Sequence, residues 1–214
     1  MEKVKKITIE DNEEFLRQVS KPVIFPDKEL ENDIKLLEQY FTESDTTLAL
    51  AAVQIGIPKR LIYLKNTDLE VINRKNNDQE TEEDKQHNEQ RILINPVVIS
   101  REGLTEYWEA CASCLDNLGK LKRPYRIVIR YQDIIGQYHD EVFEGFESTV
   151  LSHEMDHLDG ILHMDKALEV IDASDEEVMS MNLSENDVVN LQKIPIIDSM
   201  TKIYLETKSL LSKD

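Results

Sequence analysis

LSHEMDHLDGILH, residues 151–163, decides how this chain is built. It contains two histidines four residues apart, His153 and His157, with Glu154 directly after the first. On a helix, residues four apart lie on the same face, so both imidazoles can reach one metal ion. Glu154 then lies beside the ion, where a carboxylate can act as general base in metal-assisted hydrolysis. The stretch therefore predicts a metal-binding helix of the HExxH type.

Catalytic sites of this type usually take three protein ligands, and the sequence offers three ways to complete the set. His163 and Gly160 match the longer pattern H-E-x-x-H-x-x-G-x-x-H, which is typical of metzincin zinc endopeptidases. Cys111 and Cys114 together with the two helix histidines would form a closed Cys2His2 zinc site in a non-catalytic protein. One thiolate with the same two histidines would leave a position open for water. Spacing alone leaves these alternatives open.

Length and charge limit the classes of protein that fit. The chain has 214 residues, 40% of them hydrophobic, which favours one domain spanning residues 1–214. Its formal charge is −18, so we expect no direct binding to nucleic acid and none to an anionic membrane surface.

The distribution of apolar residues and cysteines indicates the compartment. No apolar stretch reaches the roughly 18 residues that span a bilayer, and the first residues lack an apolar signal segment. With only two cysteines, spaced C-x-x-C, a disulfide framework is not expected, and the pair suits a metal or redox role in a reducing compartment. We therefore predict a cytoplasmic protein.

Regular elements flank the histidine stretch. Residues 27–41 predict an amphipathic helix that begins after Asp27, a good N-cap residue. Its apolar side chains recur at helical spacing: Leu30, Ile34, Leu37 and Phe41. Short runs rich in isoleucine, valine and tyrosine predict three strands: residues 60–64, 91–99 and 125–131.

Negative charge is concentrated in two stretches with little that could be buried. Residues 66–90 carry eight acidic and three basic side chains, and a second acidic stretch covers residues 169–190. We interpret both as solvated surface insertions. Apolar residues further on predict a closing helix near residues 196–212.

Three segments of the sequence resemble the signature segments of peptide deformylases. TLALAAVQIGIPKRLIYL (47–64) and WEACASCLDNLGKLKRPYRIVIRYQD (108–133) resemble the first and second signature segments of that family, and HEMDH (153–157) resembles the third. FLRQVSKPV (15–23) and NPVVI (95–99) are similar to its connecting segments. The resemblance runs through most of the chain in order.

The resemblance implies a fold and a metal site. The fold is α+β, with mostly antiparallel sheets wrapped around the central HExxH helix. Cys111 takes the place of the ligand cysteine, so that the metal set is Cys111, His153 and His157. The family uses ferrous iron, and a thiolate with two imidazoles would also accept Zn²⁺, Ni²⁺ or Co²⁺.

The resemblance also implies an activity and its residues. The activity is removal of the N-formyl group from formylmethionine at the start of nascent peptides, with the ribosome as a candidate meeting place. Glu154 is the base, and Gln54 and the backbone N–H of Ala112 donate to the developing oxyanion. Leu48 and Val150 line the methionine pocket, and the backbone of Ala49 pairs with the peptide.

Several positions depart from the family pattern. Glycine, the usual residue at three of them, is replaced by Thr47, Ala49 and Ala110. Val53 stands where proline is usual, and Ala112 where leucine is usual. Added carbon atoms where glycine allows close approach predict an altered rim of the substrate groove and weaker or altered substrate preference. Two further departures are Cys114 at a usually apolar position and His163 at a commonly aromatic one.

Overall fold

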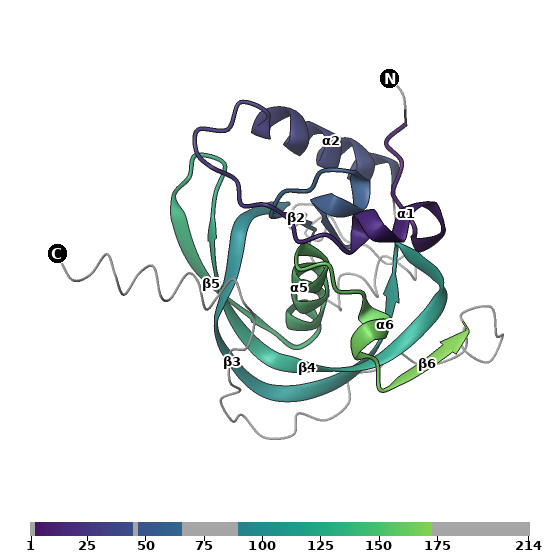
Figure 1. Ribbon diagram of the computed structural model, residues 1–214. Helices are drawn as coiled ribbons and strands as arrows, with labels where there is room; N and C mark the ends of the chain where they lie inside the picture. Colours follow the sequence, from purple (N-terminus) through teal and green to yellow (C-terminus); the bar gives the residue numbers. More distant parts are fainter. Residues whose placement is uncertain (1–2, 45–46, 66–89, 173–214) are drawn as a thin grey trace, which may run out of the picture.

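The structure is a computed structural model, and it describes residues 3–44, 47–65 and 90–172 (Figure 1). Most of the predicted insertion at residues 66–90, the acidic stretch after residue 172 and the predicted helix near residues 196–212 lie outside the described residues. No helix within the described part is long and apolar enough to cross a membrane.

One antiparallel sheet organises the described residues. Its strands follow the order β1-β2-β3-β4-β5, and β6 also pairs with β4. All five pairings are antiparallel, as the sequence predicted. The strand bounds are β1 Ala49–Ala51, β2 Leu61–Leu64, β3 Arg91–Cys111, β4 Cys114–Gln132, β5 Tyr138–Glu144 and β6 Glu169–Asp172.

Strands β3 and β4 form a long curved hairpin that wraps around the helix α5 (Gly145–Leu158) (Figure 1). Both strands continue well beyond the predicted ranges 91–99 and 125–131. The extensions include partly or fully exposed charged residues such as Glu106 and Lys122, which lower their mean hydropathy, while alternate residues such as Tyr107 and Leu121 stay buried. Pairing of Cα positions shifts at three places along the hairpin, and such irregularities increase strand bending.

The centre of the fold is the predicted HExxH helix, α5. Ten of its fourteen residues are buried, so it has no solvent-facing stripe. The helix ends at Leu158 and is followed by Gly160, whose φ is +72° and whose N–H donates to the His157 carbonyl at 3.1 Å. The N–H of Ile161 donates to the Asp156 carbonyl at 2.9 Å, which completes a Schellman cap.

The helix α2 (Leu30–Glu43) covers the other side of the sheet with the apolar face that its spacing predicted (Figure 1). Its start differs from the prediction, because Glu29 is the N-cap and makes no side-chain cap. Asp27 instead accepts from the N–H of Glu29 at 2.8 Å and pairs with Lys59 at 2.9 Å. A tertiary ion pair therefore uses the carboxylate expected to cap the helix.

Shorter elements precede and follow the sheet and α5 within the described residues. The helix α1 (Ile9–Leu16) packs near the 3-10 turn η1 (Ala52–Ile55). Just before α1, the N–H of Ile7 donates to the backbone carbonyl of Gln54 at 2.7 Å. After α5, the short helix α6 (His163–Lys166) leads into β6. Residues 169–172, the start of the second acidic stretch, are thus part of the sheet, because they pair with residues 117–120 of β4.

Candidate metal centre

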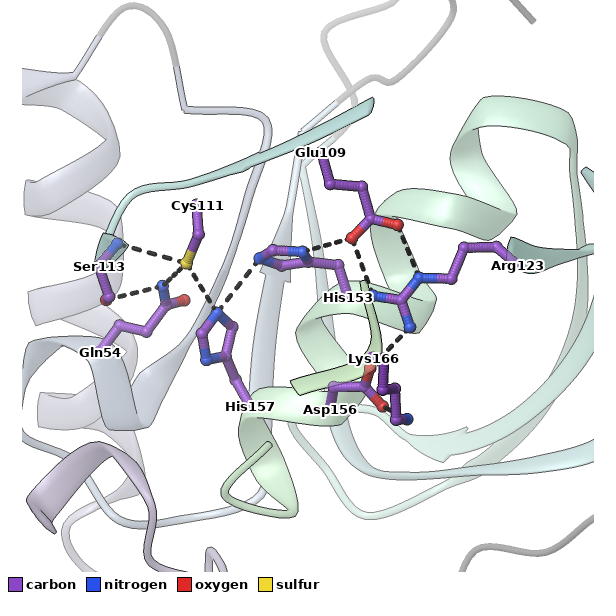
Figure 2. Close-up of polar contacts among 9 residues, drawn as sticks. All are labelled: Gln54, Glu109, Cys111, Ser113, Arg123, His153, Asp156, His157 and Lys166. Carbon is purple, nitrogen blue, oxygen red and sulfur yellow. Dashed lines mark hydrogen bonds and ion pairs between the residues drawn. The ribbon is translucent and has the colours of Figure 1, made fainter. Parts of the chain in front are cut away.

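The three predicted metal ligands come together where the β3–β4 hairpin meets α5 (Figure 2). Cys111 is the last residue of β3, directly before the two-residue turn that leads to β4. His153 and His157 lie four residues apart on α5 and point toward this turn (Figure 2). One ligand atom from each residue lies within 4.8 Å of the other two.

The spacing of these atoms suits a tetrahedral ion. Cys111 Sγ lies 3.1 Å from His157 Nε2, which lies 3.2 Å from His153 Nε2. Bond lengths of about 2.1 Å to nitrogen and about 2.3 Å to sulfur imply ligand separations of roughly 3.4 to 3.6 Å around a tetrahedral zinc ion. The observed atoms are slightly closer, so a small outward shift accommodates a cation. The donor set, one thiolate and two imidazoles, fits a divalent transition metal.

A chain of ion pairs fixes the orientation of His153 (Figure 2). Its Nδ1 lies 2.9 Å from Glu109 Oε2, so the N–H at Nδ1 donates to the carboxylate and Nε2 presents its lone pair to the metal. Arg123 holds Glu109 with two hydrogen bonds, at 2.7 and 2.8 Å, and bonds to Asp156 at 2.6 Å. Lys166 completes the chain on Asp156 at 2.6 Å.

This chain shifts the titration of the groups that it joins. Burial opposes ionisation of Glu109, but Arg123 and His153 outweigh it and lower the pKa of Glu109 to about 2. Burial likewise opposes protonation of His153, and the pKa of His153 is nevertheless raised by Glu109. Burial and neighbouring histidines lower the pKa of His157 well below its usual value, so His157 is neutral and ready to bind a metal.

Glu154, which the sequence predicts to be the general base, lines the same cleft as Cys111 and His153. It is 6% exposed, and its Oε2 accepts a hydrogen bond from the N–H of Ala51 at 2.7 Å. Burial is the main cause that raises the pKa of Glu154 above the ordinary value. A carboxylate with a raised pKa and one fixed lone pair is suited to accept a proton and to release it again.

Gln54 joins the start of the chain to the hairpin turn. Its Oε1 accepts from the same Ala51 N–H at 3.0 Å, and its Nε2 donates to Ser113 Oγ at 3.1 Å. The N–H of Ser113 points to Cys111 Sγ at 3.4 Å, and Gln54 Nε2 lies 3.9 Å from the same sulfur (Figure 2). The hydrogen bond with Cys114 and burial raise the pKa of Cys111 well above its usual value, and the N–H of Ser113 opposes this shift by favouring the thiolate. The bond to Ser113 Oγ orients the amide of Gln54 beside the metal position.

The predicted site residues line one cleft of about 570 Å³. His157 is the exception, because it is fully buried and does not line the cleft. Tyr107 and Phe146, whose rings contact edge to face at 5.7 Å, form an apolar wall with Trp108 and Leu115 that the sequence analysis did not identify. The predicted residues in the lining are Leu48, Ala49, Gln54, Cys111, Ala112, Val150, His153 and Glu154.

The two alternative ligand sets do not form. His153, His157 and His163 do not make a common set within 4.8 Å, and Cys114 does not join the set that contains His153 and His157. The metzincin pattern fails because Gly160 turns the chain and α6 carries His163 beside the ring of His153, with centroids 5.7 Å apart, not around the shared metal position. His163 instead groups with Cys111 and Cys114.

Sequence reasoning gave no role to Arg123, Asp156 or Lys166. Arg123 entered the sequence analysis only as one residue of the segment 108–133, yet it is 4% exposed and bonds to two carboxylates. The sequence carried little signal for it, because Arg123 precedes the predicted strand 125–131; its burial in the structure is what requires acidic partners. The carboxylates that pair with Arg123 are determined by the way the hairpin crosses α5.

Comparison with known proteins agrees with this geometry. The family model described as "Polypeptide deformylase" matches residues 4–172. A peptide deformylase of Erythrobacter litoralis is 35% identical over 162 residues, covering 70% of this chain and 82% of that protein. One of Pelagibacter ubique is 34% identical over 164 residues, covering 76% of this chain and 85% of that protein.

Solved structures give the same result. A probable peptide deformylase from Synechococcus phage S-SSM7 superposes with a TM-score of 0.60 at 31% identity, covering 76% of this chain and 99% of that one. The peptide deformylase of Synechococcus elongatus, solved with actinonin, gives 0.61 at 28% identity, with 78% and 79% covered. The fold and the comparisons define a metal-dependent hydrolase. The chain belongs to the peptide deformylase family.

Proposed function

We propose that this enzyme removes the N-formyl group from formylmethionine at the start of nascent peptides, using one divalent ion held by Cys111, His153 and His157. One observation carries the proposal: these ligand atoms converge at the floor of a cleft that also contains the buried carboxylate of Glu154. The matched relatives, named peptide deformylases, supply the reaction class.

The reaction is hydrolysis of the formyl amide, which yields formate and a free amine. When bound, the ion supplies Lewis acidity that activates a water and polarises the formyl oxygen. Glu154 takes a proton from the attacking water and passes it to the leaving nitrogen as the C–N bond breaks. Gln54 Nε2 and the N–H of Ala112 donate to the oxygen that gains charge, and one such donor is typically worth about 10²- to 10³-fold in rate.

The cleft suits a methionine side chain followed by an extended peptide. Leu48 and Val150 supply apolar surface in the cleft, together with the aromatic wall. Strand β1 pairs only with β2 within the described sheet, so the backbone at Ala49 can hydrogen-bond a substrate strand.

Metal identity and surroundings are further parts of the proposal. We assign ferrous iron as the native ion, with Zn²⁺, Ni²⁺ and Co²⁺ as substitutes that the same ligands accept. A substrate at the start of a nascent chain is met in the cytoplasm near the ribosome. We further propose that residues 1–214 form one domain.

The test compares three peptides with protein purified anaerobically and loaded with iron. Formate release and mass spectrometry should show turnover of formyl-Met peptides, with acetyl-Met and unblocked peptides left intact. Internal cleavage of any peptide would indicate an endopeptidase, and no turnover by metal-loaded protein would contradict the proposal.

Matched variants test the ligand set. Cys111→Ala should lose tight metal binding and turnover together. Cys114→Ala should keep the ion held by Cys111, His153 and His157 and keep turnover, because Cys114 is not in that set. Loss of turnover in both variants at equal folded fraction would contradict this assignment.

A further inference from the structure

We propose that Cys111, Cys114 and His163 form a second metal site, which binds a thiophilic cation such as Zn²⁺ or Cu⁺ and shares the sulfur of Cys111 with the first site. The inference concerns metal content and does not depend on the reaction proposed above.

The three side chains converge on one point. Cys111 and Cys114 are paired positions at the end of the β3–β4 hairpin, so both thiols lie at the same turn. α6 brings His163 to them, and one ligand atom from each of the three residues lies within 4.8 Å of the other two. All three are almost completely buried, at 4%, 1% and 1% exposed.

His163 has no other partner in the part of the chain that the structure describes. Its imidazole interacts with the thiol of Cys114, which belongs to the proposed site, and neither buried ring nitrogen has a hydrogen-bond partner among the described residues outside that site. Burying an imidazole without partners is costly, whereas a metal bond would satisfy one of these nitrogens. The ring of His153 lies close to it, at 5.7 Å between centroids.

The strand above His163 is shaped to admit it. Gly119 of β4 lies over the imidazole, and a Cβ there would approach His163 Cδ2 to 3.0 Å and Ala167 Cβ to 3.1 Å. A larger residue at position 119 would therefore press on the histidine. The absence of a side chain at Gly119 leaves His163 room beside the two thiols.

Two departures from the deformylase pattern meet here. Cys114 stands at a usually apolar position and His163 at a commonly aromatic one, 49 residues apart along the chain. Either alone reads as a packed core residue. Together they place one sulfur atom and one nitrogen atom near the sulfur of Cys111. The two substitutions and Cys111 thus form a set of three metal ligands.

The chemistry of the set defines its cation. Two thiolates and one imidazole favour soft or borderline ions, Zn²⁺ and Cu⁺ above Mg²⁺ or Ca²⁺. A thiolate has more than one lone pair and can bridge two ions, so occupation of both sites does not require Cys111 to leave the first. Cys114 and His163 do not line the substrate cleft, which places the second ion behind the first, away from substrate.

Metal content of matched variants tests the site. Metal-free, reduced protein is reconstituted with Zn²⁺ in one arm and Cu⁺ in another, passed over a weak chelating resin, and measured by elemental mass spectrometry. The wild type should retain two ions per chain in at least one arm. His163→Phe and Cys114→Ala should each retain one, and His139→Phe, which changes an exposed histidine paired with Asp133, should match the wild type.

Spectroscopy guards against loss of folding as the explanation. Co²⁺-loaded protein should show thiolate-to-metal absorption that falls by more than half, not to zero, in His163→Phe, because the intact first site keeps one of the three Co–S bonds. One ion per wild-type chain in both arms would overturn the proposal. So would two ions retained in both His163→Phe and Cys114→Ala, since the second ion would then lie elsewhere.

Discussion

Glu109 Oε2 lies 2.9 Å from His153 Nδ1, and this bond joins a metal ligand to a buried arginine. Within the described residues, His157 Nδ1 has no hydrogen-bond partner, so the orientation of the ligand pair depends on Glu109. The carboxylate also sets the tautomer that leaves His153 Nε2 free to bind an ion.

Glu109→Gln should therefore weaken metal binding by about 10- to 100-fold, because the amide cannot stabilise the bound imidazole with a full charge. Competition with a chromophoric chelator measures the affinity. Glu106→Gln is the matched control, since Glu106 lies on the same strand, pairs with Lys120 and Lys122 near the surface, and does not contact the site. Equal affinities of the two variants would show that Glu109 does not position His153.

Glu154→Gln should retain metal and lower turnover by about 10²- to 10⁴-fold. The amide oxygen can still accept from the Ala51 N–H, so the fold is preserved, but it cannot take a proton from water. Steady-state kinetics on a formyl-Met peptide at matched metal content give the result. Turnover within a few-fold of the wild type would exclude Glu154 as the base.

The rim of the cleft should limit substrate binding. Thr47 and Ala49 line the cleft, and Thr47 Oγ1 lies 2.6 Å from Ser44 Oγ, so its side chain is fixed at the rim. Restoring glycine at both positions and leucine at Ala112 should raise kcat/KM by about tenfold, equivalent to roughly 1.4 kcal/mol. The gain should appear mainly in KM. An unchanged kcat/KM would show that these departures are neutral.

Gly160→Ala should destabilise the protein by about 3 kcal/mol or more, because two costs add. Its φ is +72°, and a Cβ would lie 2.1 Å from the carbonyl oxygen of Arg17, a backbone atom that cannot move aside. Gly136→Ala is the control, with φ of +83° but its nearest neighbour 3.4 Å away in Phe25, and should cost only about 1–2 kcal/mol. Urea unfolding compares them, and equal losses would disprove the contact with Arg17.

The sequence by itself was enough to predict the metal-binding helix, the residue types that supply the metal ligands, and the presence of β-strands. The spacing of His153 and His157 is a local property of a helix, and Glu154 follows from the same geometry. The apolar face of α2 could also be predicted from local sequence, because the 3.6-residue spacing of its apolar side chains is sufficient. The resemblance to peptide deformylases selected Cys111 over His163, and the structure brings Cys111 to the two histidines.

Only the tertiary structure decided which distant groups meet. The bonds from Arg123 to Glu109 and Asp156 depend on how a curved hairpin crosses α5, and no spacing along the chain encodes that crossing. The position of His163 was also decided by the tertiary structure. In the linear sequence this residue matched a pattern of three metal-binding histidines. In three dimensions Gly160 turns the chain and places that ring beside Cys111 and Cys114, because a positive φ redirects the backbone after the helix.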